Sequence, residues 1–392
     1  MSKTLHLFIF ADALGWELVQ RYDVLKSIAP IQKKCETLFG YSATCDPTIL
    51  TGASPREHRH FSFFVKCDPA NSPFKPMRYL GWLPERLAGY HKLRNRLSRY
   101  VARHKGYTGY FQLYSVPFRY LPWLDYTEKK DIYEPGGIIG GQESIFEIWK
   151  RSGKPYYRSD WRNGDAVNYA HAEDVLKSGK AELIYLFTAG LDAVMHRYGP
   201  IAPQTAEAFK AFEQRISKLL QCAQESYDEV RLAIFSDHGM TEVTGTSDLR
   251  LRCERLPLKY GTDYIAVWDS TMARFWFHNE TARQEIMALL SDAPEGDILD
   301  TETLRDWRCD FQDQAYGELF YLLKPGNLFV PSFLNLSKVP GMHGYAPDHK
   351  DSAACWLSNF EPPDPVERLE DIFPVMQYAT PLRSTSVSTT PR

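Results

Sequence analysis

The segment RLAIFSDHGM, residues 231–240, joins a short apolar run to an acidic turn that contains a histidine. The apolar run, Arg231–Ser236, lacks the alternation of a half-buried strand and follows a helical pattern from Gln204 to Ser226. Two other runs, Thr4–Ala11 and Ala181–Thr188, have the same character. Apolar strands separated by helices are typical of a parallel sheet that helices cover on both faces. The sequence therefore predicts an α/β fold with a mostly parallel central sheet.

An acidic residue follows each of the three predicted strands, and in two cases a histidine accompanies it. Asp12 comes directly after the first run, and Asp192 and His196 come after the second. The third run ends in Asp237 and His238. Ligands of open α/β sheets bind beyond the carboxyl ends of the strands, so these side chains are expected to converge on one site. Asp192 and His196 are one helical turn apart and share a helix face.

The residue types of this predicted site favour a metal centre. A further histidine, His343, lies in the glycine-flanked segment GMHGYAP, residues 341–347. Carboxylate oxygen and imidazole nitrogen without thiolate suit Zn²⁺ or Mn²⁺ at an open catalytic position. An isolated Asp-x-x-x-His pair usually lies on a solvated helix face, and an isolated Ser-Asp-His often caps a helix. Their joint occurrence behind three buried strands favours the metal site.

The composition sets limits on partners and compartment. The chain has 392 residues with 44% hydrophobic content, and its net charge of −3 provides no global attraction to nucleic acid or anionic membranes. Its seven cysteines are irregularly spaced without a CxxC pair, which argues against a disulfide framework and favours a reducing compartment. The apolar stretch LHLFIFADALGW is short and contains Asp12, and no run of 18 apolar residues follows. We expect a cytoplasmic protein without a transmembrane segment.

Two stretches of different composition interrupt the strand–helix alternation. Residues 61–137 are rich in aromatic residues and arginine, and residues 249–340 mix strand-like runs with a helix near Thr281 to Leu290. We interpret both as insertions into one catalytic core, the first as a cap, and expect a disordered polar tail. The expected core segments are 1–60, 138–248 and 341–383, and the tail is 384–392.

The order of these motifs resembles the alkaline phosphatase superfamily, and its type I phosphodiesterase/nucleotide pyrophosphatase branch looks closest. The resemblance implies a three-layer α/β/α sandwich and two divalent metal ions, most simply Zn²⁺ with Mn²⁺ as the alternative. By motif, one ion would be held by Asp192, His196 and His343. The other would be held by Asp12, Asp237 and His238, with the nucleophile bridging toward it.

The resemblance also indicates the nucleophile. Family members place a hydroxyl or modified cysteine at a helix start, nine positions before a Thr-Gly pair. Here that pair is Thr51-Gly52, and nine positions earlier is Ser42. A hydroxyl there benefits from a nearby metal and from the helix N-terminus, although a serine in this setting often only caps its helix. Thr44 and Thr48 are the fallback candidates, and Cys45 is a weaker one.

Two departures from the family pattern affect the expected substrate. Nucleotide pyrophosphatases usually carry an asparagine three residues after the nucleophile, where this chain has Cys45. The Cys-x-Pro-x-Arg pattern of sulfatases is absent, so a sulfatase is disfavoured. The choice between a phosphate monoester and a phosphate diester as the substrate stays open. Arg158 and Arg162 are candidates for clamping the phosphate, because a guanidinium matches two phosphate oxygens; surface arginines are the plainer explanation.

The expected function is a metal-dependent hydrolase of a small-molecule phosphate ester (a nucleotide, a phospholipid-like or a glycan-linked substrate). A phosphodiesterase that acts through a phospho-Ser42 intermediate fits best. The alternatives are a phosphomonoesterase or phosphonate hydrolase with the same metals, and a metal-binding pseudoenzyme that recognises a phosphorylated glycan or lipid. No specific nucleic-acid partner is expected, and the sequence does not indicate an oligomeric state.

The aromatic insertion supports two interpretations. Six of its aromatic residues could line a substrate cap, although a compact insertion also needs a core of its own: Tyr79, Trp82, Tyr110, Tyr114, Tyr120 and Trp123. A helix is expected from Pro84 to His104, and a solvated face explains its basic residues: Arg94, Arg96, Arg99 and Arg103.

Overall fold

The computed structural model describes residues 3–85 and 90–380. Its centre is a six-stranded sheet in the order β2-β16-β7-β1-β6-β5, in which β1, β5, β6 and β7 run parallel and β16 runs antiparallel to β7 and β2. The sequence prediction of a mostly parallel sheet is therefore confirmed. The strands of this sheet are β1 (Thr4–Ala11), β2 (Ile31–Cys35), β5 (Tyr156–Arg158), β6 (Leu183–Thr188), β7 (Glu229–Phe235) and β16 (Ala354–Ser358).

Helices cover both faces of the sheet, because its strands are apolar on both faces. Leu7 and Ile9 of β1 belong to the core under one helical layer, and Phe8 and Phe10 belong to the core under the other. The first layer comprises α1 (Trp16–Tyr22), α7 (Asp165–Ser178), α8 (Gly190–Tyr198) and α9 (Pro203–Gln224). The second comprises α2 (Ser42–Thr51), α6 (Ile145–Ser152) and α13 (Ile372–Tyr378). The result is a three-layer α/β/α sandwich.

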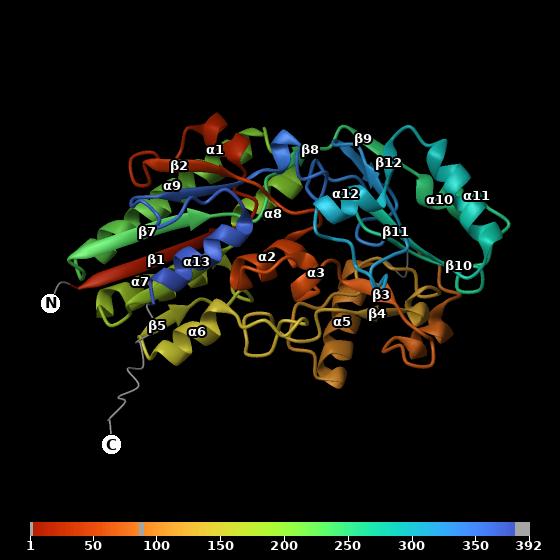
Figure 1. The fold of residues 1–392 in the computed structure, drawn as a ribbon, viewed down its shortest axis with the longest axis horizontal. Helices are drawn as coiled ribbons and strands as arrows, with labels where there is room; N and C mark the ends of the chain where they lie inside the picture. Colours follow the sequence, from red (N-terminus) through yellow and green to blue (C-terminus); the bar gives the residue numbers. More distant parts are fainter. Residues whose placement is uncertain (1–2, 86–89, 381–392) are drawn as a thin grey trace, which may run out of the picture.

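A second, antiparallel sheet lies beside the sandwich, at the right of Figure 1. Its strand order is β10-β11-β13-β12, and α11 packs against it. The elements are β10 (Tyr264–Trp268), β11 (Met272–Phe277), β12 (Gly296–Leu299), β13 (Leu319–Leu323) and α11 (Glu280–Ser291). The aromatic-rich stretch lies below it in the same view and contributes β3 (Phe64–Lys66), β4 (Leu124–Tyr126) and α5 (His91–Lys105).

The two stretches interpreted as separate insertions share one hydrophobic core. Phe64, Phe74 and Tyr126 from the first pack in the same cluster as Trp268 and Phe275 from the second. The first stretch therefore does not bury a core of its own. It completes the core of the antiparallel sheet.

Short elements connect these parts. The helices are α3 (Pro55–His58), α10 (Leu249–Glu254) and α12 (Thr301–Asp306). Two small ribbons pair β8 (Thr241–Glu242) with β15 (Gly341–Met342) and β9 (Gly245–Ser247) with β14 (Asn327–Phe329). Single 3₁₀ turns span Lys75–Leu80, Leu121–Trp123, Lys350–Ser352 and Leu369–Asp371.

Most predicted element boundaries differ from the structure by a few residues. The first predicted strand coincides with β1, while β6 begins at Leu183 and not at Ala181. The helix expected from Pro84 corresponds to α5, which begins after Tyr90 because the backbone ψ of that residue, 113°, is not helical. Residues 86–89 and the expected tail from 384 lie outside the described residues.

Two sequence features can be compared directly with the structure. All seven cysteines lie in the described part of the chain, and each is free. Among the helices of the described residues, none has the length and apolar character that crossing a membrane requires.

Candidate active site

Asp12, Asp237 and His238 come together where two central strands end. Asp12 follows β1, and its backbone N–H continues the ladder by donating to Thr188 at 2.9 Å. Asp237 and His238 follow β7, the neighbour of β1. One potential ligand atom from each of the three side chains lies within 4.8 Å of the others. The convergence predicted from the strand ends is present in the fold.

Local contacts orient this first group. The Asp237 carboxylate accepts backbone N–H bonds from Ala13 at 3.2 Å and from His238 at 3.0 Å. The His238 Nδ1 atom lies 2.9 Å from the carbonyl oxygen of Gly239, which leaves Nε2 directed at the acidic residues. Position 239 requires glycine, because a Cβ there would stand 2.2 Å from the carbonyl oxygen of Asp351. The turn after β7 thus fixes both side chains.

Asp192, His196 and His343 form a second group of the same kind. Asp192 and His196 lie one turn apart on α8, which follows β6, and Asp192 Oδ1 is 3.2 Å from His196 Nε2. His343 follows β15, and its Nε2 atom is 3.8 Å from the same carboxylate oxygen. The His196 Nδ1 atom lies 2.8 Å from the carbonyl oxygen of Gly341, the first residue of β15. The strand that precedes His343 therefore also orients His196. The three ligand atoms again lie within 4.8 Å of one another.

The electrostatics of the two groups fit divalent cations. Asp12 Oδ1, Asp192 Oδ1 and Asp237 Oδ2 are buried, and each has a histidine Nε2 atom as a near neighbour, at 3.8, 3.2 and 2.9 Å respectively. Burial, and next the charge of Asp237, raise the pKa of Asp12 well above its ordinary value. Burial, and next the neighbouring His238 and His196, lower the pKa of His343 well below its ordinary value, so this imidazole is neutral. Clustered carboxylates and imidazoles without a thiolate are a donor set that suits Zn²⁺ or Mn²⁺.

Ser42 is the first residue of α2, and its hydroxyl faces the first group. The distance from Ser42 Oγ to His238 Nε2 is 3.0 Å. The preceding residue, Tyr41, is anchored at its hydroxyl, which lies 2.9 Å from Thr271 Oγ1. Gly344 packs against the Tyr41 ring so closely that a Cβ would stand 2.5 Å from it, and its φ of +85° also favours glycine. The helix start is therefore held in place from the other side of the cavity.

The three fallback nucleophiles point elsewhere. Thr44 donates to the carbonyl oxygen of Phe61 at 2.7 Å, and Thr48 Oγ1 lies 2.8 Å from His58 Nε2. Cys45 is buried in the core under the sheet. In the described chain, Ser42 is the one of the four candidates that lines the cavity beside the acidic and histidine residues.

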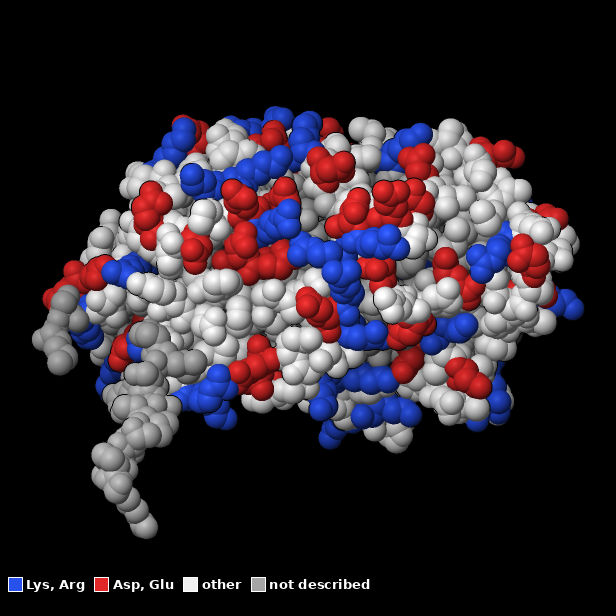
Figure 2. Space-filling view, viewed as in Figure 1, with Lys and Arg blue, Asp and Glu red and all other residues white. Residues whose placement is uncertain are grey.

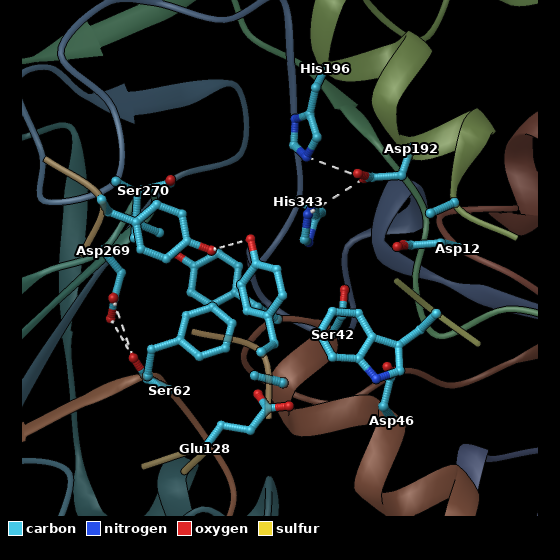
Figure 3. A pocket seen from close by; sticks show the side chains of 18 of the residues that line it. Asp12, Ser42, Asp46, Ser62, Glu128, Asp192, His196, Asp269, Ser270 and His343 are labelled. Carbon is cyan, nitrogen blue, oxygen red and sulfur yellow. Dashed lines mark hydrogen bonds and ion pairs between the residues drawn. The ribbon is translucent and has the colours of Figure 1, made fainter. Parts of the chain in front are cut away.

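A cavity of about 610 Å³ opens beside Ser42. Asp12, Asp192, His196 and His343 lie on one side of it, and several aromatic side chains line the rest (Figure 3). The aromatic residues that line it include Phe63, Tyr110, Tyr114, Tyr133 and Trp161. The site therefore combines a group of metal-type ligands, which with bound cations suits an anionic centre, with aromatic ring surface that suits a bulky group and that lies among polar residues such as Ser62, Glu128 and Asp269 (Figure 3).

The six aromatic residues considered for a cap lie in three different environments: the cavity, the shared hydrophobic core and the protein surface. Tyr110 and Tyr114 line the cavity and share a hydrogen bond of 3.0 Å between their hydroxyls. Tyr120 stacks on Tyr260 in the shared core, with centroids 4.0 Å apart, and Trp123 packs over the backbone of Gly261. The other two, Tyr79 and Trp82, are exposed.

The two candidate arginines already have protein partners. Arg158 donates to Glu134 at 2.8 Å and does not line the cavity. Arg162 lines the cavity wall, but it donates to Asp131 at 2.8 Å and also pairs with Asp160 at 3.0 Å. A phosphate contact by Arg162 would have to compete with these carboxylates.

Three acidic residues of the cavity were not anticipated from the sequence: Asp46, Glu128 and Asp269. Asp46 lies one turn after Ser42 on α2 and lines the cavity, and its Oδ1 atom is buried without a hydrogen-bond partner. Glu128 also lines the cavity, and burial raises its pKa to about 8. Helical spacing from Ser42 could have revealed Asp46, whereas no local pattern marks Glu128.

Comparison with known families and structures places the chain in the alkaline phosphatase superfamily. Residues 7–345 match the sequence model of type I phosphodiesterase / nucleotide pyrophosphatase. The chain belongs to this family, and its core motifs and both insertions lie largely within the matched range.

Solved structures with the same fold include members of this superfamily. Human ectonucleotide pyrophosphatase/phosphodiesterase 5 superposes with a TM-score of 0.66 at 13% identity, over 95% of this chain and 94% of the other. An inactive murine form in complex with AMP gives 0.68 at 14%, over 96% and 95%. Phosphonoacetate hydrolase from Sinorhizobium meliloti 1021, in complex with phosphonoformate, gives 0.64 at 12%, over 96% of each chain. At these identities the likeness establishes the fold.

Proposed function

We propose that this protein is a two-metal phosphodiesterase that acts through a phosphodiester-linked Ser42 intermediate. The observation that carries the proposal is the position of Ser42 Oγ at the start of α2, 3.0 Å from His238 Nε2 and beside two groups of metal-type ligands. Asp12, Asp237 and His238 would hold one divalent cation. The other would be held by Asp192, His196 and His343.

The chain supplies the nucleophile and an anion-binding helix end. The Ser42 oxygen loses its proton and forms a bond to phosphorus, and the leaving oxygen departs on the opposite side with its electron pair and takes up a proton. The first N–H groups of α2 lack intrahelical partners and favour the negative charge of the phosphoryl oxygens. A water molecule then breaks the Ser42–phosphorus bond, and the serine regains its proton. The cations, when bound, supply Lewis-acid stabilisation of the charged oxygens.

The lining of the cavity supports a phosphate ester with an apolar or aromatic leaving group. Tyr110 and Tyr114 line the cavity and offer ring surface to such a group. Asp46 and Glu128 add two carboxyl groups to the lining, and burial raises the pKa of both. A nucleotide, a phospholipid-like diester or a glycan-linked diester meets these conditions. We also propose a reducing, cytoplasmic location, which the cysteine content supports.

One observation favours a second candidate, a phosphomonoesterase or phosphonate hydrolase. Cys45 occupies the position at which nucleotide pyrophosphatases usually carry an asparagine that contacts phosphate. Its side chain is buried in the core, and its Sγ atom lies 3.7 Å from Thr37 Oγ1. Cys45 therefore does not replace the phosphate contact of that asparagine. A substrate with a different geometry, which does not need the contact, would explain its absence.

The test is hydrolysis of bis(p-nitrophenyl) phosphate against p-nitrophenyl phosphate, with Zn²⁺ or Mn²⁺ and with chelator. A chelator-sensitive preference for the diester supports the proposal. A preference for the monoester would replace it with the second candidate. Two bound metal ions without activity on either ester, or on a nucleotide and phospholipid panel, would favour a binding protein.

A further inference from the structure

The outer face of α5 carries an unusual concentration of positive charge. Its sequence, HKLRNRLSRYVARHK, contains six lysines and arginines and no acidic residue. Lys92, Arg96, Arg99 and Arg103 recur at spacings of four, three and four, so they form one stripe along the helix, and all four are exposed. Within the described residues no carboxylate pairs with any of these four side chains. Figure 2 shows the lysines and arginines gathered over α5, at the lower edge of the molecule.

Exposed apolar side chains accompany this basic stripe. Leu93 and Tyr100 lie two turns apart on the same helix, next to the stripe, and are 45% and 67% exposed. Trp82, which precedes the helix in the chain, is 77% exposed, and Tyr79 and Tyr90 are exposed as well. Exposed apolar residues are common on protein surfaces, but single and scattered. Here five large ones occur within one short stretch of chain, interleaved with cations.

We propose that this surface docks the protein on an anionic phospholipid membrane. We call it the α5 face, and it consists of Trp82, Lys92, Leu93, Arg96, Arg99, Tyr100 and Arg103. Tryptophan and tyrosine favour the headgroup level of a bilayer, and lysine and arginine are attracted to anionic lipids. Because the whole chain has a net charge of −3, the attraction comes from this local patch. The sequence interpretation of Arg94, Arg96, Arg99 and Arg103 as a solvated face is wrong for Arg94, which is buried and donates to the carbonyl oxygen of Val116 at 2.7 Å. It also did not include the apolar side chains beside the exposed cations.

The apolar component favours a lipid surface over nucleic acid. Single-stranded nucleic acid is bound by aromatic rings that stack on bases within a basic groove. Leu93 has no ring to stack, and the stripe lies along the outer side of a helix. An aliphatic side chain next to exposed tryptophan and tyrosine is well suited to burial at the boundary of headgroups and acyl chains.

This inference does not depend on the chemistry at Ser42. Docking would nevertheless affect that chemistry, because Tyr110 and Tyr114 follow α5 directly in the chain and line the cavity. The aromatic side of the cavity would be held close to the lipid. A substrate embedded in the membrane could then enter without full exposure to water.

The experiment is co-sedimentation of the full chain with vesicles of phosphatidylcholine alone or with about 30% phosphatidylglycerol. We expect binding to the anionic vesicles only, with a marked decrease between about 0.1 M and 0.5 M salt. The triple variant Arg96→Glu, Arg99→Glu, Arg103→Glu should bind at least about tenfold more weakly. The double variant Trp82→Ser, Leu93→Ser should lose binding by a similar factor while it keeps the salt dependence.

A matched control reverses three exposed lysines elsewhere: Lys33→Glu, Lys34→Glu, Lys210→Glu. It changes the net charge by the same amount and should retain vesicle binding. Equal losses in the control and in the α5 variant would overturn the proposal, as would absence of wild-type binding to anionic vesicles. Binding to an oligonucleotide but not to vesicles would also overturn it and would assign the face to nucleic acid. Circular dichroism of each variant establishes that it is folded.

Discussion

The imidazole rings of His238 and His343 stack on each other, with 3.7 Å between their centroids and 13° between their planes. One ring belongs to the group at the end of β7, and the other belongs to the group that includes α8. The two groups therefore meet at this contact, although their histidines are far apart in the sequence. The ligands for the two proposed cations therefore lie side by side, as a hydrolase that holds two cations at one phosphate requires.

Replacement of His343 with alanine should remove one bound metal ion and lower the turnover rate about a hundredfold or more, because one group then has only two ligands. Metal analysis after dialysis, combined with the diester assay, measures both effects. The control is His171→Ala, at an exposed position on α7. Unchanged metal content in the His343 variant would contradict the ligand assignment.

Replacement of Ser42 with alanine should lower kcat by at least about 10⁴-fold, while the metal content stays close to that of the wild type. The side chain supplies the attacking oxygen, whereas six other side chains remain to hold the ions. Rapid acid quenching of a reaction with labelled substrate should trap phosphorus on the wild-type chain only. Full activity of the alanine variant would remove Ser42 from the mechanism.

Tyr110→Ala should raise KM for an aromatic diester about tenfold and change kcat much less, because the ring lines the cavity and, in the proposed complex, would contact the leaving group and not the reacting atoms. Steady-state kinetics with bis(p-nitrophenyl) phosphate separates the two parameters. Tyr378→Ala is the control, since Tyr378 is 63% exposed on α13, outside the cavity. If kcat alone falls, the ring acts on the chemistry and not on binding.

Arg274→Met should lower the free energy of unfolding by about 3–5 kcal/mol, because it leaves a buried carboxylate without its cation. Arg274 is fully buried, lies 3.1 Å from Asp269, and also donates to Ser62 at 2.7 Å. Urea denaturation provides the measurement. The matched change Arg56→Met breaks an exposed pair with Asp310 and should cost less than about 1 kcal/mol. Similar losses of unfolding free energy in the two variants would show that burial does not strengthen the Arg274–Asp269 pair.

Glu128→Gln should stabilise the protein at alkaline pH. Burial raises the pKa of Glu128 to about 8, so the folded state holds a proton that the unfolded chain releases near its ordinary pKa. The folded state therefore binds more protons than the unfolded state, and stability falls as pH rises from about 4.3 to about 8. Thermal unfolding at pH 6 and pH 9 should show a smaller decrease for the variant than for the wild type.

The control for this experiment is Glu361→Gln, which changes an exposed carboxylate and should leave the pH dependence as it is. A wild-type protein whose stability does not decrease between these pH values would show that Glu128 is ionised without cost. A larger loss of stability between pH 6 and pH 9 in the Glu128 variant than in the wild type would also contradict the prediction.

The convergence of Asp12, Asp237 and His238 could be predicted because it follows from strand order alone. In a parallel sheet the carboxyl ends of neighbouring strands meet at one edge, so an acidic residue after each apolar run must approach the others. Asp192 and His196 follow from helical spacing in the same way. The placement of Ser42 rested on a family spacing, and the structure brings its hydroxyl to the same cavity.

The remaining cavity residues depend on pairings that sequence periodicity does not contain. Glu128 reaches the cavity because β4 pairs with β3, and Asp269 reaches it because the antiparallel sheet packs on the aromatic stretch. Arg158 had the right residue type for a phosphate contact, but a nearby Glu134 determines its direction. Such choices between competing partners are decided by tertiary packing.

The central position of β1 has a consequence for synthesis on the ribosome. Its hydrogen-bonding partners are β6 and β7. The later of the two in the chain, β7, ends at Phe235. At about 5–20 residues per second, the apolar strand Thr4–Ala11 waits roughly 10–45 s for both neighbours to be made. During that interval its edges and both apolar faces require shielding, so the nascent chain is a natural client for a ribosome-associated chaperone.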